Sequence, residues 1–146
     1  MIRRFERFFA VLSDINRAWH KIASEEMSRH GLKGSHAVYM TMMERHPGGI
    51  TCGELCEYCG RDKAEVSRMT AILIEKGMVK KEGDKIYRSK FYLTDLGMKT
   101  AAEVIAKAEQ AVIKANYNID PSDRETFYRV LESISLNLIS MSENGL

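Results

Sequence analysis

The sequence predicts a mainly helical α+β protein with six helices and one two-stranded β-hairpin. In six segments, apolar residues recur at every third or fourth position, which is the spacing of one face of an α-helix. Between residues 78 and 93 this spacing is lost. Met78-Val79 precedes a turn that contains Gly83, and residues 86–93, with tyrosines and a phenylalanine, follow it, which is typical of a hairpin. A chain of 146 residues, 45% of them hydrophobic, fits one domain or a compact pair of subdomains that share a core.

The first helix is predicted to occupy roughly the first 27 residues of the chain. Basic residues precede apolar ones here, as in a signal peptide, but Glu6 and Arg7 interrupt the apolar run, so an amphipathic helix is favoured. The residues of its apolar stripe are Phe5, Phe8, Leu12, Ile15, Trp19 and Ile22.

A second helix is predicted to begin after Ser35, because Gly31 and Gly34 end the first helix and a serine is a favoured N-cap. This helix carries the apolar residues 38–43. It ends at the sequence HPGG, residues 46–49, because proline and glycine interrupt helical backbone.

Two capped helices follow. Thr51 is placed to cap the third helix, and Glu54 completes a capping box three residues later. Asp62 and Glu65 repeat this spacing at the start of the fourth helix. The glycines expected to end these two helices are Gly60 and Gly77. The apolar positions of the fourth helix are Val66, Met69, Ile72 and Leu73.

The hairpin is predicted to consist of a strand from Val79, a turn at residues 82–85 and a strand over residues 86–93. Helical spacing returns at Thr94 and continues to about Lys114. The last helix begins with Asp120 as N-cap and Pro121 at its first position. Its apolar stripe is Phe127, Val130, Leu131, Ile134, Leu138 and Met141.

This order places a helix-turn-helix directly before a β-hairpin, which is the arrangement of a winged helix. We therefore expect residues 35–97 to form a winged helix-turn-helix DNA-binding domain. The flanking helices are too long and too apolar on one face to remain in solvent alone. We expect residues 1–30 and 98–146 to form a helical dimerisation region, and the whole chain to be a single compact unit.

Composition excludes several classes of protein. The longest apolar run, Phe8 to Leu12, is far shorter than the about 20 residues that span a bilayer. The chain has an odd number of cysteines, all within residues 52–59, which suits a reducing compartment better than a disulfide framework. We therefore expect a cytoplasmic protein with no membrane association.

Basic residues are concentrated between Arg61 and Lys90. This segment has nine Lys and Arg against five Asp and Glu, whereas the rest of the chain has 13 positive and 15 negative residues. A local net charge of +4 on a nearly neutral protein indicates one surface that faces a polyanion. Such a run is also compatible with an ordinary solvated surface.

The chain resembles the MarR (multiple-antibiotic-resistance regulator) family over ITCGELCEYCGRDKAEVSRMTAILIEKGMV, continuing to YLTDLG. The matching elements are the opening Thr-x2-Glu-Leu, the Asp-Lys pair before the fourth helix, Val66-Ser67-Arg68, Glu75-Lys76-Gly77, and Leu93-Thr94-x2-Gly97 at the exit of the hairpin. The specific part of the resemblance covers residues 50–97, and the order of helices extends it to both ends.

The resemblance implies a homodimeric transcription regulator, either repressor or activator, that binds a palindromic operator in double-stranded DNA. Many such proteins release DNA when they sense a small aromatic ligand or an oxidant. The wing of this chain departs from the family, because many members have a longer loop with an Asp-Arg-Arg element. Here Lys85, Arg88 and Lys90 must supply the positive charge of the wing.

The fourth helix, residues 63–76, has the side chains that a DNA-reading helix needs. Opposite its apolar face lie short side chains together with Arg68, which is long enough to reach a base edge. Lys63 and Ser67 suit phosphate contacts. The alternative for Arg68 is an ion pair with Glu65 or Glu75. The predicted DNA-binding residues are Arg61, Lys63, Ser67, Arg68, Lys85, Arg88 and Lys90, with the wing at residues 80–90.

The three cysteines, Cys52, Cys56 and Cys59, have the Cys-x3-Cys-x2-Cys spacing of radical S-adenosylmethionine enzymes. A helix capped at Thr51 holds these thiols in a row, however, and 146 residues leave no room for the barrel of such an enzyme. An iron–sulfur enzyme therefore remains only a remote alternative. A redox- or metal-responsive regulator that uses these cysteines, with His46 as a further zinc ligand, is a closer one. The alternative role is that of small hydrophobic residues in the core.

An effector pocket is predicted where the first helix meets the DNA-binding region, on the basis of the resemblance and of soft or aromatic side chains there. The alternative is that the methionine-rich face belongs to an ordinary core. The predicted pocket residues are Arg17, Trp19, His20, His36, Tyr39 and Met40. No catalytic arrangement of residues emerges from the sequence, so we expect no enzyme activity, no cofactor and no resident metal.

Overall fold

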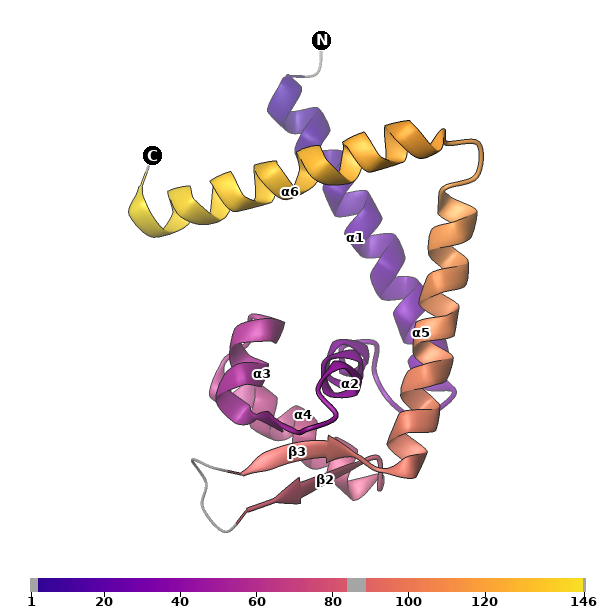
Figure 1. Cartoon of the computed structure of the whole chain (residues 1–146), viewed down its shortest axis with the longest axis vertical. Coiled ribbons are helices and arrows are strands. Elements are labelled where there is room, and N and C mark those ends of the chain that lie inside the picture. The colour runs from indigo at the N-terminus through magenta and orange to yellow at the C-terminus, as the bar shows by residue number, and fades with distance from the viewer. Residues whose placement is uncertain (1–2, 84–88, 146) are drawn as a thin grey trace. The chain divides into compact units, whose positions relative to one another are not determined.

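The computed structural model describes residues 3–83 and 89–145. Within these ranges the chain forms six helices and a small antiparallel sheet, so the predicted fold class is confirmed (Figure 1). The elements are α1 (Arg4–Ser28), α2 (His36–Arg45), β1 (Ile50–Thr51), α3 (Cys52–Cys59), α4 (Lys63–Glu75), β2 (Val79–Glu82), β3 (Lys90–Leu93), α5 (Asp95–Ala115) and α6 (Pro121–Asn144).

The chain divides into two compact units. The first comprises Met1–Glu109 and contains α1 to β3 together with most of α5. The second comprises Gln110–Leu146 and contains the end of α5 and all of α6. The helix-turn-helix, the hairpin and the helix ends that adjoin them therefore all belong to the first unit.

The predicted caps of α3 and α4 are confirmed. The backbone N–H of Glu54 donates to Oγ1 of Thr51 (3.2 Å), and the N–H of Thr51 donates to Oε2 of Glu54 (2.8 Å). At α4, the N–H of Glu65 donates to Oδ1 of Asp62 (2.8 Å). These bonds satisfy helix N–H groups that would otherwise lack a partner. They fix where the two helices of the helix-turn-helix begin.

The connection between α3 and α4 depends on a glycine. Gly60 ends α3 in the left-handed conformation, with φ of 61°, which most other residues adopt only at a cost. The N–H of Arg61 then donates to the carbonyl oxygen of Cys56 (3.1 Å), which closes the helix end. The chain is thereby turned directly into the cap of α4.

Ser35 occupies the predicted N-cap position of α2, but its side chain makes no hydrogen bond to the helix. Its backbone is already helical, with φ of −61° and ψ of −19°, whereas an N-cap that bonds through its side chain normally has extended backbone. The ring of His36 forms a side-chain hydrogen bond at this helix start, because the N–H of Lys33 donates to His36 Nδ1 (3.1 Å).

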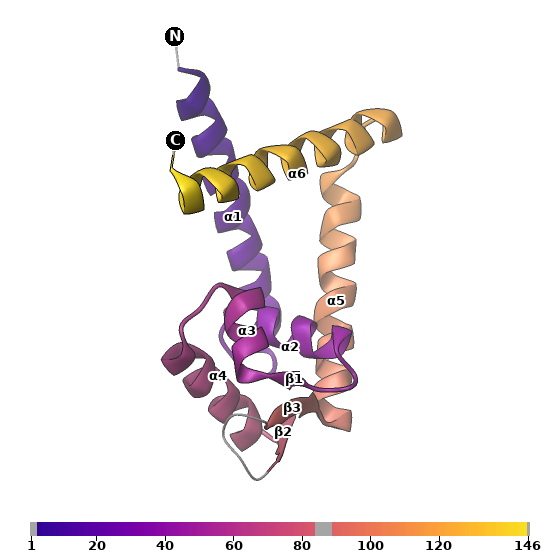
Figure 2. The same ribbon diagram turned by 60° about the vertical axis from the view of Figure 1, so that its left-hand side comes forward.

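The sheet has three strands in the order β1-β3-β2, rather than the two that the sequence predicts. Ile50 of β1 lies opposite Phe91 of β3, and Lys81 of β2 lies opposite Phe91 on its other side. Figure 2 shows β1 beside β3, at the point where the chain enters α3. The hairpin is thereby attached to the helix-turn-helix through its third strand.

One hydrophobic core supports the first unit. Its central side chains come from α2, β1, α3 and α4, and Met27 at the end of α1 and Ala101 of α5 join them. Burial of a large aliphatic side chain stabilises the fold by roughly 1.5–3 kcal/mol. The fully buried members from these four elements are Tyr39, Met40, Ile50, Leu55, Val66 and Leu73. This core holds α4 in a fixed position on the domain.

Several apolar side chains of α1 and of the second unit are exposed in the single chain. Phe9 of α1 is 71% exposed and Ile113 of α5 is 72% exposed. Helix α6 has no buried side chain among its described residues. Apolar stripes on long helices are stable only when another element covers them. None of the described helices combines the length and apolarity needed to cross a lipid bilayer.

Candidate nucleic-acid interface

Helix α4 has one buried and one exposed face, as the sequence predicts. Val66, Met69 and Leu73 anchor it to the core. The predicted place of Ile72 on the buried face is wrong, because Ile72 is 36% exposed and Thr70 is buried instead. The hydroxyl of Thr70 donates to the carbonyl oxygen of Val66 (2.9 Å), which allows this polar side chain to be buried. The exposed face consists of Lys63, Ala64, Ser67, Arg68 and Ala71.

Arg68 is exposed in the middle of this face. Neither of the ion pairs considered for it forms, and Arg68 pairs with no acidic side chain within residues 3–83 and 89–145. Ala64 and Ala71 are exposed beside it on the helix surface. Short side chains around one long arginine allow close approach to a major groove, in which the guanidinium can form two hydrogen bonds to guanine.

Arg61 lies just before α4 and pairs with Glu65, since Arg61 Nε lies 3.6 Å from Glu65 Oε1. The carboxylate that the sequence suggested for Arg68 is therefore taken by Arg61. Lys63 is exposed in the first turn of α4. Three of the predicted DNA-binding side chains, those of Lys63, Ser67 and Arg68, lie together on α4, and Arg61 lies at its entrance.

The wing is described up to Gly83 and again from Ser89. Lys85 and Arg88, which the sequence predicts as DNA contacts, lie outside the described residues. Lys90 is exposed at the start of β3, opposite Glu82 in the sheet. Its positive charge contributes, after the bonds from Thr51, to holding the pKa of Glu54 below its usual range. Lys90 therefore has acidic groups nearby in this structure.

Two further basic residues of the wing, Lys80 and Lys81, were not among the predicted contacts. Lys80 Nζ lies 3.1 Å from Glu82 Oε1, whereas Lys81 Nζ lies over the ring of Phe91, 5.8 Å from its centre. The sequence signal that could have identified Lys81 is its place in the basic pair Lys80-Lys81 just before the turn of the hairpin. Lys81 is therefore a positively charged side chain of the wing that lies within the described residues, close to α4.

A hollow of about 340 Å³ lies between α4 and the wing. It is lined on one side by Lys63, Ala64 and Ser67, and on the other by Lys81 and Phe91. The exposed face of α4 and the basic strand of the hairpin therefore border the same concave surface. Two ammonium groups beside a concave surface attract an anion such as a DNA phosphate.

All three cysteines of α3 are half-buried free thiols that pack against the core. Burial raises the pKa of the Cys59 thiol, and burial together with the neighbouring Cys56 raises the pKa of Cys52. Raised pKa values keep the thiols of Cys52 and Cys59 protonated and slow to react. Within the described part of the chain, the three sulfur atoms and His46 do not converge on a metal site.

The predicted effector-pocket residues lie in two different environments. His36, Tyr39 and Met40 are buried in the core of the first unit. Arg17 and His20 are exposed on α1, where Arg17 pairs with Asp14, and Trp19 is 38% exposed. Burial raises the pKa of Tyr39 to about 12. Its hydroxyl is inaccessible to solvent and has no hydrogen-bond partner among the described residues. The effector pocket stays a prediction.

The sequence of residues 30–85 matches the model of the MarR family. The matched residues are somewhat over a third of the chain, and in this segment the chain is similar to MarR proteins. The match spans α2, the helix-turn-helix and the first strand of the wing, which are the elements that build the surface described above. No curated protein matches the chain.

Solved structures of MarR regulators have the same fold. A MarR-family regulator from Silicibacter pomeroyi is 20% identical, with a TM-score of 0.79 over 93% of this chain and 92% of the other. A MarR regulator from Methanosarcina mazei is also 20% identical, with a TM-score of 0.81 over 93% and 92%. A MarR-family regulator from Listeria monocytogenes, solved in complex with a 26mer DNA, is 18% identical, with a TM-score of 0.81 over 94% of each chain.

Proposed function

We propose that this protein is a transcription regulator of the MarR type, a homodimer that binds a palindromic DNA operator in a sequence-specific manner. The observation that carries the proposal is the exposed face of α4, where Arg68 is unpaired among the described residues and is flanked by short side chains. In this proposal α4 enters the major groove, Arg68 contacts a base edge, and Lys63 and Ser67 contact phosphates. The protein acts in the cytoplasm, where its free thiols stay reduced.

The wing extends the contact to the neighbouring groove. Of its described cations we assign Lys81 and Lys90 to this contact, and we assign Lys85 and Arg88 to the same role from their sequence positions. Arg61 contributes from the entrance of α4 when it leaves Glu65. The DNA bound to the structurally similar Listeria regulator supports duplex DNA as the partner of this fold.

Dimerisation is assigned to residues 1–30 and 98–146, and DNA binding to residues 35–97. The support is the exposed apolar surface of α1, of the end of α5 and of α6, which a second copy would cover. Two copies related by a two-fold axis present two α4 helices, and two half-sites of inverted sequence match that symmetry. We further propose that a small aromatic effector modulates DNA binding.

The experiment that tests this function is selection of bound duplexes from a random DNA pool, followed by size analysis of the complex. We expect enrichment of an inverted repeat that is bound by two chains. We also expect the affinity to fall steeply as salt is added, because Lys and Arg displace counterions from the phosphates. Recovery of unenriched DNA, or of a protein that binds no DNA at low salt, would contradict the proposal.

A further inference from the structure

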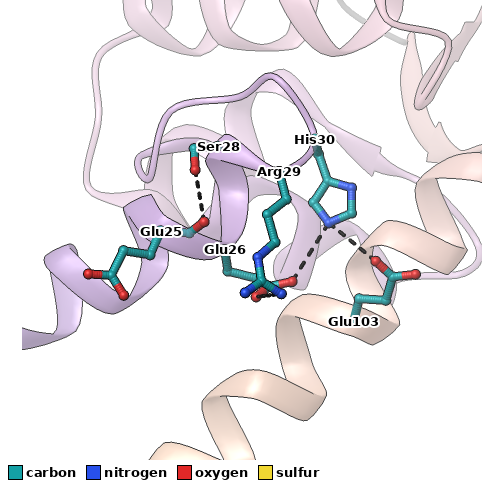
Figure 3. A network of polar contacts seen from close by, with 6 residues as sticks. All are labelled: Glu25, Glu26, Ser28, Arg29, His30 and Glu103. Atoms are coloured by element: carbon teal, nitrogen blue, oxygen red, sulfur yellow. Dashed lines mark hydrogen bonds and ion pairs between the residues drawn. The ribbon is translucent and has the colours of Figure 1, made fainter.

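A cluster of three potential metal ligands lies in the first unit, at the junction between α1 and α5. Glu26 is in the last turn of α1, His30 follows that helix, and Glu103 is on α5. Figure 3 shows the ring of His30 directed between the two carboxylates, while the carboxylate of Glu25 points away from the group. None of these residues belongs to the DNA-binding surface.

The distances between the three groups suit one bound ion. His30 Nε2 lies 3.3 Å from Glu103 Oε2 and 3.8 Å from Glu26 Oε1, and the three ligand atoms lie within 4.8 Å of one another. In a tetrahedral site with metal–ligand distances of about 2.1 Å, neighbouring ligand atoms lie about 3.4 Å apart. A small rotation of the Glu26 side chain brings its oxygen to the same separation.

Burial gives an independent reason to expect a ligand here. Glu26 is only 7% exposed. His30 Nε2 is inaccessible to solvent, and among the described residues it has no hydrogen bond, only the two ion-pair contacts to Glu26 and Glu103. A buried polar atom without a partner costs free energy, and such atoms are uncommon in folded proteins. A metal ion at this position would supply the missing partner.

Arg29 is compatible with such an ion. Its guanidinium Nη1 lies 3.6 Å from Oε2 of Glu26, whereas Oε1 of the same carboxylate faces His30. Arg29 can therefore hold one oxygen of Glu26 while the other binds a metal, as partners around a metal site commonly do. The Arg29 side chain is 69% exposed, so most of it lies at the surface beside the cluster.

We infer that Glu26, His30 and Glu103 bind one divalent transition-metal ion. Two carboxylates and a neutral imidazole carry a charge of about −2, which a divalent cation neutralises. One nitrogen and two oxygen ligands suit Zn²⁺, Mn²⁺ or Fe²⁺, and this site lacks the thiolates that would select Cu⁺. Three protein ligands leave one position for water or a small exogenous ligand. The site goes beyond the proposed DNA binding and does not depend on it.

The test is a calorimetric titration of the full-length, chelator-treated and reduced protein with Zn²⁺. We expect about one ion per chain, as at three-ligand zinc sites. His30→Gln and Glu103→Gln should each weaken Zn²⁺ binding by about tenfold or more, because mutation of the residues that merely surround a metal ligand already weakens metal binding by that factor. Glu25→Gln is the matched control and should bind Zn²⁺ as the wild type does, because its carboxylate faces away from the cluster.

Two further measurements distinguish metal binding at this cluster from unfolding of the variants and from metal binding by the cysteines. Glu103 is 46% exposed, so Glu103→Gln should retain the fold, and circular dichroism checks that its loss of binding is not unfolding. Co²⁺ in place of Zn²⁺ should show no thiolate-to-cobalt absorption, because no cysteine is among the ligands. A wild type that binds no Zn²⁺, variants that bind it undiminished, or a thiolate spectrum from Cys52, Cys56 and Cys59 would overturn the inference. No DNA is used, so failure of operator binding leaves this test unaffected.

Discussion

Arg61 and Glu65 form an ion pair at the entrance of α4, with 3.6 Å between Arg61 Nε and Glu65 Oε1. This pair holds one of the cations proposed for DNA binding on the protein itself and places a carboxylate beside the proposed path of the phosphates. Both side chains are partly exposed, so the pair contributes little to stability. In the proposed complex, the main effect of this pair is to lower the affinity for DNA.

Glu65→Gln should therefore raise the affinity for duplex DNA. The substitution removes a negative charge and releases Arg61 for a phosphate, so we expect roughly a three- to tenfold gain at low salt and a salt dependence steeper by up to about one phosphate contact. Fluorescence anisotropy at several salt concentrations measures both quantities. Glu44→Gln on α2 is the control, and an effect of equal size there, or no effect of Glu65→Gln, would contradict this role of the pair.

Gly97 should be intolerant of even a methyl group. A Cβ atom at this position would lie 1.9 Å from the carbonyl oxygen of Met78, so α5 could no longer pack against the start of β2. We expect Gly97→Ala to lower the free energy of unfolding by about 1–3 kcal/mol. Gly53 in α3 is the matched control, because a Cβ there meets no atom within 4 Å.

Gly53→Ala should stabilise the protein by about 0.5–1 kcal/mol, since alanine favours helix more than glycine does. Urea unfolding of both variants gives the comparison. Equal stability of the two alanine variants would show that the approach of Gly97 to Met78 is not tight in solution.

Stability should decrease in mild acid because of His36. Burial, with further contributions from the charges of Lys33 and Lys76, lowers the pKa of His36 in the folded state. The unfolded chain then binds a proton more readily, so the contribution of His36 is complete above the unfolded pKa of about 6.5 and is lost as the pH falls below it.

The change in unfolding free energy from this one group can reach at most about 1.4 kcal/mol per pH unit. Urea unfolding between pH 8 and pH 5 should show a weaker pH dependence for His36→Gln than for the wild type. His20→Gln, at an exposed position on α1, should leave the dependence unchanged. A His36→Gln profile parallel to that of the wild type would exclude His36 as its source.

The thiols of Cys52 and Cys59 should react slowly in the folded protein. Burial raises the pKa of both groups and thereby reduces the fraction of reactive thiolate near neutral pH. We expect their modification by a disulfide reagent at pH 7 to be about tenfold or more slower than in urea-unfolded protein. Mass spectrometry of the modified peptides follows each site. Equal rates in the folded and unfolded states would instead favour a redox-responsive regulator.

Much of the fold was predictable because its signals are local. Thr51 and Asp62 cap α3 and α4 through residues three positions away, and Asp120 caps α6 in a similar way. Gly60 and Gly77 have the left-handed backbone conformation expected of a glycine that follows a helix. These short-range contacts predict where α3, α4 and α6 begin without knowledge of the rest of the chain.

Features that depend on distant parts of the chain could not be predicted. Strand β1 has two residues, too few to show alternation, and it exists because Ile50 pairs with Phe91 far along the chain. On α4, helical periodicity gives the direction of each side chain but not what covers it. The sequence therefore did not show that Thr70 is buried and Ile72 exposed. Glu103 likewise joins Glu26 and His30 only through the packing of α5.

The central claim is that the exposed face of α4 reads a DNA sequence through Arg68. The most direct test compares the dissociation constants of wild type, Arg68→Ala and Arg45→Ala for the selected operator and for a scrambled duplex of equal length. Arg45, on α2, is exposed and outside the proposed interface. We predict that Arg68→Ala reduces the preference for the operator by roughly 1–3 kcal/mol per half-site, while Arg45→Ala retains it. An undiminished preference in Arg68→Ala would contradict the account.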